Sequence, residues 1–158
     1  MDNDEVIAGV VHEIGKNETF TAWKEGGTWL NGKAVHVSGV ATLADSLIAT
    51  GLPYSDFQRL DPYMASLTYL CRHAQGIRRL GSAATDLAYV ACGRFEGFYE
   101  YGLHQWDIAA GILLVREAGG RVSDFSGNEN NLRGDEIVAS SALVFTEFLE
   151  SVSRFIVK

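Results

Sequence analysis

Two acidic residues, Glu100 and Asp107, each adjoin a segment of mostly apolar or small residues. Asp107 precedes residues 108–115, IAAGILLV, and a carboxylate in such surroundings costs free energy unless something compensates it. The N-terminus of a helix supplies part of that compensation through its free N–H groups, and a bound cation would supply more. Glu100 follows the largely apolar and aromatic residues 95–99. The sequence therefore predicts two acids beside a strand-to-helix junction, where open α/β sheets usually bind ligands.

A second junction contains Gly81, Ser82 and Ala83, between an expected strand and an expected helix. Glycine lets the backbone approach a ligand closely, and the N–H groups that follow can bind a polyol oxygen or an anion. The simpler interpretation is that Ser82 only caps the helix. Both interpretations place these three residues at the N-terminal end of a helix.

Residues 1–40 have the pattern of antiparallel β structure, because β-branched and alternating segments are separated by turn residues. Asn31-Gly32 is the strongest short hairpin signal, and it suits a type I′ turn. The expected strands are residues 6–14, 19–23, 28–30 and 34–37.

Residues 41–158 change to alternating strands and helices, which predicts a parallel or mixed sheet with helices on its faces. Pro62 should kink the first of these helices or delay its start. The expected strands are 46–49, 77–80, 95–100, 121–124 and 136–139, and the expected helices are 55–73, 83–92, 107–118 and 142–155. The predicted fold class is α/β: the end of an antiparallel sheet, then a mixed, mostly parallel sheet flanked by helices.

The composition is that of an ordinary globular chain of 158 residues, with 47% hydrophobic and 21% charged residues. A net charge of −7 argues against nucleic acid or an anionic membrane as the main partner, although a metal ion could still attract an anionic substrate. Cys71 and Cys92 are too few for a disulfide framework, and we expect a reduced, cytoplasmic setting. No apolar run approaches the roughly 20 residues of a membrane span, and the acidic start is unlike a secretory signal.

Three motifs carry a resemblance to a known family. They are WDIAAG at 106–111 with EAGG at 117–120, GSAA at 81–84 with DLA at 86–88, and GG at 26–27 followed by WLNGK at 29–33. Their order and spacing resemble the C-terminal signature of the inositol monophosphatase family, whose members are Mg²⁺-dependent, lithium-sensitive sugar-phosphate phosphatases.

The resemblance implies a role for each candidate residue. It implies that Asp107 binds a Mg²⁺ ion, the second in the family's site, and that Glu100 accepts a hydrogen bond from a hydroxyl of the substrate ring. It also implies that the backbone at Gly81, Ser82 and Ala83 contacts the substrate, with serine where several members carry threonine. The plainer alternatives are a helix-capping aspartate, a solvated acid at a strand end and a helix cap.

The same resemblance implies that part of the family's site lies outside this chain. An upstream glutamate and the two aspartates of an Asp-Pro-x-Asp-Gly-Thr motif hold the other metals in the family, and residues 1–158 lack that motif. We therefore expect 1–40 to be the last strands of the family's first antiparallel sheet and 41–158 to be the C-terminal α/β domain. The expected function is the C-terminal part of a phosphatase that hydrolyses inositol monophosphate, or a related sugar or polyol phosphate, with metal-activated water. The chain alone is expected to have little or no activity.

Two alternatives remain open at this stage. The chain could be a naturally truncated binding or interaction module, with an exposed sheet edge that invites a partner or a homodimer. It could instead belong to a phosphatase for fructose-1,6-bisphosphate or adenosine 3′,5′-bisphosphate.

Five further residues near the motifs receive structural interpretations. Trp106 is expected to anchor the helix in the core, and His104 to have a structural role or to lie at the rim of the site. Arg79, with Arg78 beside it, could attract phosphate, lie in solvent or lie at a subunit interface. Glu117 is expected to contact local backbone or an arginine.

Overall fold

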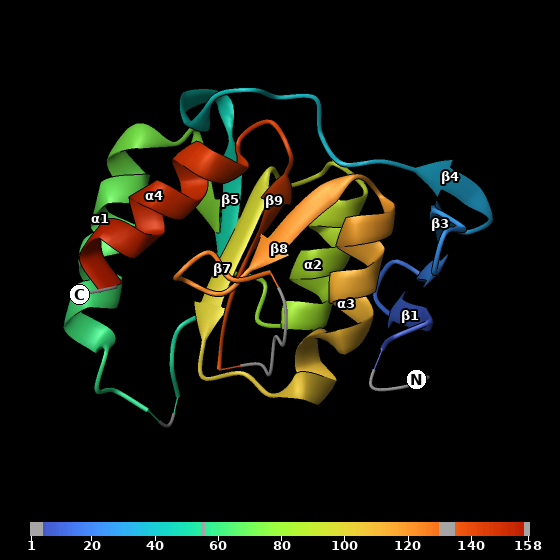
Figure 1. The fold of residues 1–158 in the computed structure, drawn as a ribbon, viewed down its shortest axis with the longest axis horizontal. Helices are drawn as coiled ribbons and strands as arrows, with labels where there is room; N and C mark the ends of the chain where they lie inside the picture. Colours follow the sequence, from blue (N-terminus) through green and yellow to red (C-terminus); the bar gives the residue numbers. More distant parts are fainter. Residues whose placement is uncertain (1–4, 55, 130–134, 157–158) are drawn as a thin grey trace.

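The computed structural model describes residues 5–54, 56–129 and 135–156, and it contains two β-sheets with helices between and beside them (Figure 1). The first sheet has the strand order β1-β2-β3-β4, and every adjacent pair is antiparallel. Its strands are β1 (Ala8–Glu13), β2 (Glu18–Trp23), β3 (Thr28–Leu30) and β4 (Lys33–Val35). Asn31 and Gly32 between β3 and β4 have φ values of 49° and 77°, which agrees with the predicted type I′ turn.

The second sheet has five strands in the order β6-β5-β7-β9-β8. Its strands are β5 (Leu47–Thr50), β6 (Gly76–Arg78), β7 (Gly97–Tyr101), β8 (Gly120–Ser123) and β9 (Glu136–Ser141). The β5 strand pairs in parallel with both β6 and β7, whereas β9 pairs antiparallel with β7 and β8. The predicted α/β class with a mixed second sheet is therefore confirmed, but two of the four strand pairings are antiparallel, so the sheet is not mostly parallel as expected.

Four α-helices form two layers around the second sheet. They are α1 (Leu60–His73), α2 (Ala83–Ala91), α3 (Gln105–Glu117) and α4 (Phe145–Ile156), and a short 3₁₀ turn covers Leu43–Asp45. The α1 and α4 helices pack together on one face, and α2 and α3 pack together on the other, between the two sheets (Figure 1). None of the helices in the described ranges is long and apolar enough to cross a membrane.

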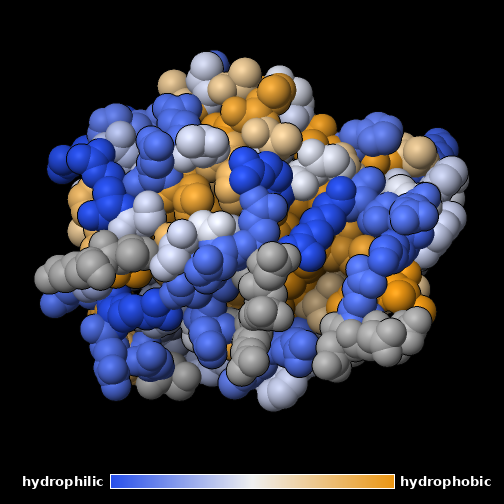
Figure 2. All heavy atoms as spheres, viewed as in Figure 1, coloured by the Kyte–Doolittle hydropathy of each residue, from blue (hydrophilic) through white to orange (hydrophobic). Residues whose placement is uncertain are grey.

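Successive residues of β7 face opposite layers, because side chains alternate along a strand. Phe98 joins the apolar cluster that includes Leu87 and Leu114 from the inner helices, whereas Tyr99 joins the cluster that includes Tyr63 and Phe148 from the outer helices. The central strand of the sheet thus separates two cores. Hydrophilic side chains cover much of the molecular face drawn in Figure 2, with hydrophobic patches between them.

Small residues let α3 lie close to both of its neighbours. A Cβ added at Gly111 would lie 2.5 Å from Leu87 Cδ1 on α2, and one at Gly9 on β1 would lie 3.1 Å from the Cα of Ala110. At its other end, α3 is tied to the first sheet because Glu117 accepts hydrogen bonds from the backbone N–H groups of residues 25 and 27, at 2.9 and 3.0 Å. The expectation that Glu117 contacts local backbone or an arginine is therefore wrong, because its partners are backbone groups remote in the sequence.

The outer face of the first sheet carries exposed apolar side chains. Val10 on β1 is 62% exposed, and Trp23 on β2 is 49% exposed. Trp23 stacks on Trp29 of β3, with ring centroids 6.0 Å apart and planes inclined by only 6°. No described element packs on this face of the sheet in Figure 1.

Three helix starts differ from the predicted ones. The first helix begins at Leu60, so Pro62 lies in its first turn, where proline is tolerated; residue 55, the predicted start, is outside the described ranges. The α4 helix begins at Phe145 rather than at 142. The α3 helix begins at Gln105, which places Asp107 inside the first turn rather than at the N-cap.

Candidate functional site

One pocket of about 340 Å³ lies where β5 and β7 end and α2 and α3 begin. This is the carboxyl end of parallel strands, the usual ligand site of such sheets. The lining residues are Leu52, Tyr54, Arg79, Gly81, Ser82, Ala83, Ala84, Glu100, Leu103, Trp106 and Asp107. All five candidates named from the sequence are among them, so the fold brings together residues from three separate segments.

Asp107 lies at the start of α3 with its carboxylate partly held by the helix itself. Asp107 Oδ2 accepts a hydrogen bond from the backbone N–H of His104 at 2.9 Å, and the Asp107 N–H donates to the His104 carbonyl at the same distance. The side chain is half-buried. The first turn of α3 therefore holds this carboxylate at the wall of the pocket.

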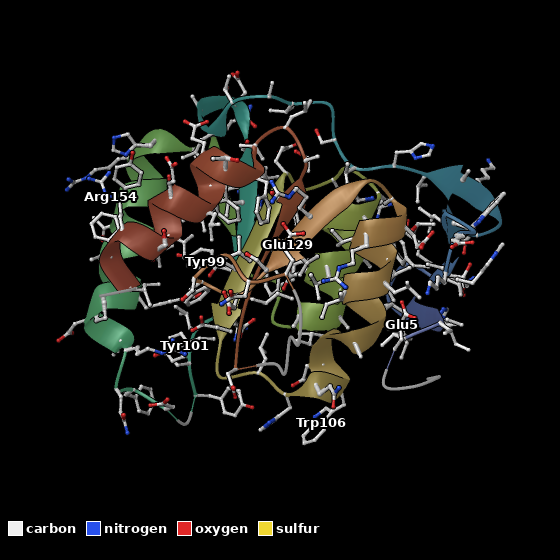
Figure 3. All side chains as sticks on the ribbon, in the orientation of Figure 1. Glu5, Tyr99, Tyr101, Trp106, Glu129 and Arg154 are labelled. Carbon is white, nitrogen blue, oxygen red and sulfur yellow. The ribbon has the colours of Figure 1, made fainter. Side chains whose placement is uncertain are left out.

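Trp106 is 79% exposed, so the expectation that it anchors α3 in the core is wrong. It projects from the first turn of α3 away from the rest of the protein (Figure 3). His104 stacks against the indole, with ring centroids 4.5 Å apart. Ile108, which is fully buried, anchors this end of the helix instead. Trp106 belongs to the rim of the pocket.

The Glu100 carboxylate lies directly against the backbone of Gly51. A Cβ added at Gly51 would stand 1.9 Å from Glu100 Cδ and Oε1 and 2.2 Å from Oε2. The pKa of Glu100 is raised to about 7, mainly by burial; the Arg79 guanidinium opposes the rise, and the Asp107 carboxylate adds to it. Near neutral pH this group is therefore present in both protonation states.

A third acid, Asp86, lies behind the pocket on α2. It is 1% exposed, and neither carboxylate oxygen has a hydrogen-bond partner among the residues that the structure describes. Its pKa is raised to about 7, mainly by burial and also by the Glu100 carboxylate, while Arg79 opposes the rise. In the sequence, Asp86 is distinguished only as part of the DLA motif. An acid within the apolar run of a short helix could have predicted this buried carboxyl.

Arg79 provides positive charge at the pocket, beside the N-terminus of α2. Its guanidinium lies over Gly81, where an added Cβ would be 2.6 Å from Arg79 Nη1. Gly81 has a φ of 94°, a conformation that favours glycine. Ser82 is the N-cap of α2, and its hydroxyl accepts from the Thr85 N–H at 3.4 Å. The N–H groups of this helix end and Arg79 together suit an anion.

A metal ion would find only part of a ligand set in this pocket. Asp107 offers the hard carboxylate oxygens that Mg²⁺ prefers. Within the described ranges, however, no group of three or more His, Cys, Asp or Glu side chains is arranged to hold a metal ion. Of the residues that line the pocket, Asp107 would thus contribute one ligand to a magnesium site.

Comparisons with known proteins identify the family of this chain. Residues 1–157 match the profile of the inositol monophosphatase family. The chain is 39% identical over 150 residues to the inositol-1-monophosphatase of Mesorhizobium japonicum, covering 95% of this chain and 56% of that protein. It is 45% identical over 145 residues to the Nus factor SuhB of Pseudomonas aeruginosa, covering 90% and 54%.

Solved structures give the same result. The crystal structure of the extragenic suppressor protein suhB from Bartonella henselae superimposes with a TM-score of 0.89 at 39% identity, covering 95% of this chain and 57% of that one. The chain thus spans little more than half the length of the relatives that it matches. With the profile matched along almost its whole length, the chain belongs to the inositol monophosphatase family.

Proposed function

We propose that this chain forms the substrate-binding wall of a Mg²⁺-dependent phosphatase that acts on inositol monophosphate or a related polyol phosphate. The observation that carries the proposal is the convergence of Asp107, Glu100 and residues 81–83 on one pocket. Family membership supports the reaction class, and the chemistry of the pocket supports the substrate class, since it pairs acids with anion-binding groups.

Each group in the pocket has a defined task in this proposal. Asp107 would hold one magnesium ion, which would supply positive charge to stabilise the leaving oxygen. Glu100 accepts a hydrogen bond from a ring hydroxyl. The backbone N–H groups at the start of α2 bind a polyol or phosphate oxygen, and Arg79 attracts the anionic end of the substrate.

The isolated chain is proposed to bind but not to turn over substrate. It spans 54–56% of the two curated relatives, and it contains no Asp-Pro-x-Asp-Gly-Thr motif. Metal-assisted hydrolysis needs a generator for the nucleophile as well as a substrate-binding wall. Inhibition by lithium is likewise expected only where the family's complete metal site is present.

The test combines a binding measurement with an activity measurement on residues 1–158. Calorimetric titration with inositol 1-phosphate in the presence of Mg²⁺ should detect binding, which Glu100→Gln and Asp107→Asn should each weaken about tenfold, as expected for loss of a hydrogen bond to a charged group. Glu150→Gln, an exposed acid on α4, is the matched control and should bind like the wild type. Mg²⁺-dependent phosphate release from this chain at a rate typical of enzymes would contradict the proposal that the chain alone binds substrate without turning it over.

A second candidate is a binding module without turnover. The 45% identity to a protein named Nus factor SuhB supports it. A longer protein that contains this chain together with an upstream Asp-Pro-x-Asp-Gly-Thr segment separates the two candidates. Turnover of inositol 1-phosphate, fructose-1,6-bisphosphate or adenosine 3′,5′-bisphosphate by that protein would favour the phosphatase and identify its substrate, and no turnover of any of them would favour the module.

A further inference from the structure

Two buried hydroxyl groups join the ends of β5 and β7 directly beneath the pocket. The Thr50 Oγ1 and Tyr63 OH atoms are 2.6 Å apart, and Thr50 and Tyr63 are 2% and 0% exposed. The Tyr63 hydroxyl also contacts the carbonyl oxygens of Gly51 at 3.0 Å and Tyr99 at 3.1 Å. Thr50 Oγ1 contacts the same two carbonyls at 3.2 and 2.9 Å. The two hydroxyls carry two protons, one in the contact between their oxygens and one donated to a carbonyl, so the Thr50–Tyr63 hydroxyl pair links the ends of β5 and β7.

The two carbonyls belong to the residues that determine where Glu100 stands. Thr50 and Tyr99 are paired in the parallel register of β5 and β7, and Gly51 and Glu100 follow them directly. The Glu100 carboxylate lies over Gly51 so closely that a side chain at position 51 would displace it. A change in the spacing of the two strand ends would therefore move this carboxylate relative to the pocket.

The hydroxyl of Tyr63 acts separately from its ring. The ring packs against Tyr99 and Tyr101, with centroid distances of 5.0 and 4.9 Å, and these contacts would survive loss of the oxygen. Tyr101 offers a matched comparison in the same cluster, because its hydroxyl donates to the Asp56 carbonyl at 3.1 Å rather than to the strand ends.

We propose that Thr50 and Tyr63 are positioning residues for Glu100. Their hydroxyl pair holds the ends of β5 and β7 at a fixed spacing, and this spacing determines the position of the Glu100 carboxylate, which accepts a hydrogen bond from the polyol hydroxyl. The role of Glu100 as polyol acceptor rests on the proposed function, whereas the control of its position does not. Thr50 and Tyr63 lie beneath the pocket and are absent from its lining. They therefore act through Glu100 rather than on the substrate.

The experiment compares Tyr63→Phe with Tyr101→Phe in residues 1–158. The ¹³C signal of the Glu100 carboxyl, identified by its loss in Glu100→Gln, is recorded at one fixed pH. Tyr63→Phe should shift this signal and weaken binding of inositol 1-phosphate about fivefold, as expected for one hydrogen bond, without changing the affinity for inorganic phosphate. Tyr101→Phe should change neither the signal nor either affinity.

A second pair of variants keeps the test decisive if Tyr63→Phe fails to fold. Thr50→Ser keeps the hydroxyl and should retain the wild-type Glu100 signal, whereas the isosteric Thr50→Val should shift it. A folded Tyr63→Phe or Thr50→Val protein with an unshifted Glu100 signal would overturn the proposal, even if its melting temperature fell. If wild-type protein binds no inositol 1-phosphate, the proposed function fails, and the Glu100 signal still decides whether the hydroxyl pair positions the carboxylate.

Discussion

At the scale of single residues, Asp86 and Glu100 depart from the behaviour of ordinary surface acids. Burial removes much of the hydration of each carboxyl and raises the pKa of both. The Glu100 carboxylate also raises the pKa of Asp86. Arg79 offsets only part of this cost, because it is exposed and its charge is screened by water. The pocket therefore contains a locally unfavourable concentration of negative charge, which a cation would relieve.

Replacing Asp86 by asparagine should stabilise the protein at alkaline pH. The pKa of Asp86 rises from 3.8 to about 7 on folding, so the folded state holds a proton that the unfolded state releases. The contribution of the Asp86 carboxyl to the free energy of unfolding is therefore fully present below about pH 4. It is lost as the pH rises to about 7. We expect Asp86→Asn to raise the free energy of unfolding at pH 8 by on the order of 2–4 kcal/mol, with little change at pH 4.

Urea unfolding at several pH values, without divalent cations, measures this difference. Glu150→Gln removes the same formal charge from an exposed position and should not reproduce the pH-dependent gain. If the gain for Asp86→Asn were equal at pH 4 and pH 8, it could not come from ionisation of the buried carboxyl.

A second prediction at the scale of single residues concerns Gly51. The Glu100 carboxylate occupies the place of a Cβ at position 51, so Gly51→Ala should displace Glu100 and weaken inositol 1-phosphate binding about fivefold or more. Gly39→Ala, with nothing within 4 Å of an added Cβ, should leave binding unchanged. Equal affinities of Gly51→Ala and wild type in calorimetric titration would contradict the close approach of the two residues.

At the scale of elements, the position of α3 depends on its contacts with α2 and β1. Gly111 faces Leu87 with no room for a methyl group, and Gly9 meets the backbone of Ala110. Because Asp107 is in the first turn of α3, the packing of this helix also determines where the carboxylate stands. The site thus depends on glycines that do not line it.

Gly111→Ala should destabilise the protein despite the higher helix propensity of alanine. The added Cβ would lie 2.6 Å from Leu87 Cβ, an atom that cannot rotate away. Overpacking of about 1–3 kcal/mol should exceed the gain in propensity of about 1 kcal/mol. Gly39→Ala, with nothing within 4 Å, should change stability by less than about 0.5 kcal/mol. Thermal unfolding of both variants tests this, and an unchanged or higher midpoint for Gly111→Ala would refute it.

Local patterns predicted the type and order of nearly every element, because alternation, turn residues and caps act over a few residues. They also named the five candidates that the fold gathers at the pocket, although the roles of those residues stay predictions. The failures concern contacts between remote segments. The apolar character of Trp106 favoured burial, yet α3 turns it outward. Nothing near Glu117 in sequence indicated that its partners are the N–H groups of residues 25 and 27.

At the scale of the whole molecule, the two sheets differ in how they are covered. The second sheet has a helical layer on each face, whereas the first sheet packs against α3 on one face and carries Val10 and Trp23 exposed on the other. The central strands β7 and β9 contribute fully buried residues, among them Phe98, Tyr99 and Val138. The two sheets should therefore open at different free energies.

Hydrogen exchange of residues 1–158 should resolve this difference. Paired amides of β7 and β9 should exchange only through global unfolding, and those of β1 and β2 should exchange at least tenfold faster through local opening. A protection factor for β1 and β2 equal to that of β7 would contradict this order and would mean that the two sheets unfold as one unit.

The stacked pair Trp23 and Trp29 joins neighbouring strands of the first sheet, with planes inclined by 6°. Two indoles with ring centroids 6.0 Å apart couple their electronic transitions, so the tryptophan contribution to the circular dichroism spectrum should change when the first sheet opens. Trp106, remote from both at the pocket rim, should report instead through fluorescence intensity when a ligand arrives. The protein thus contains separate optical signals for the integrity of its first sheet and for occupancy of its pocket, without any added label.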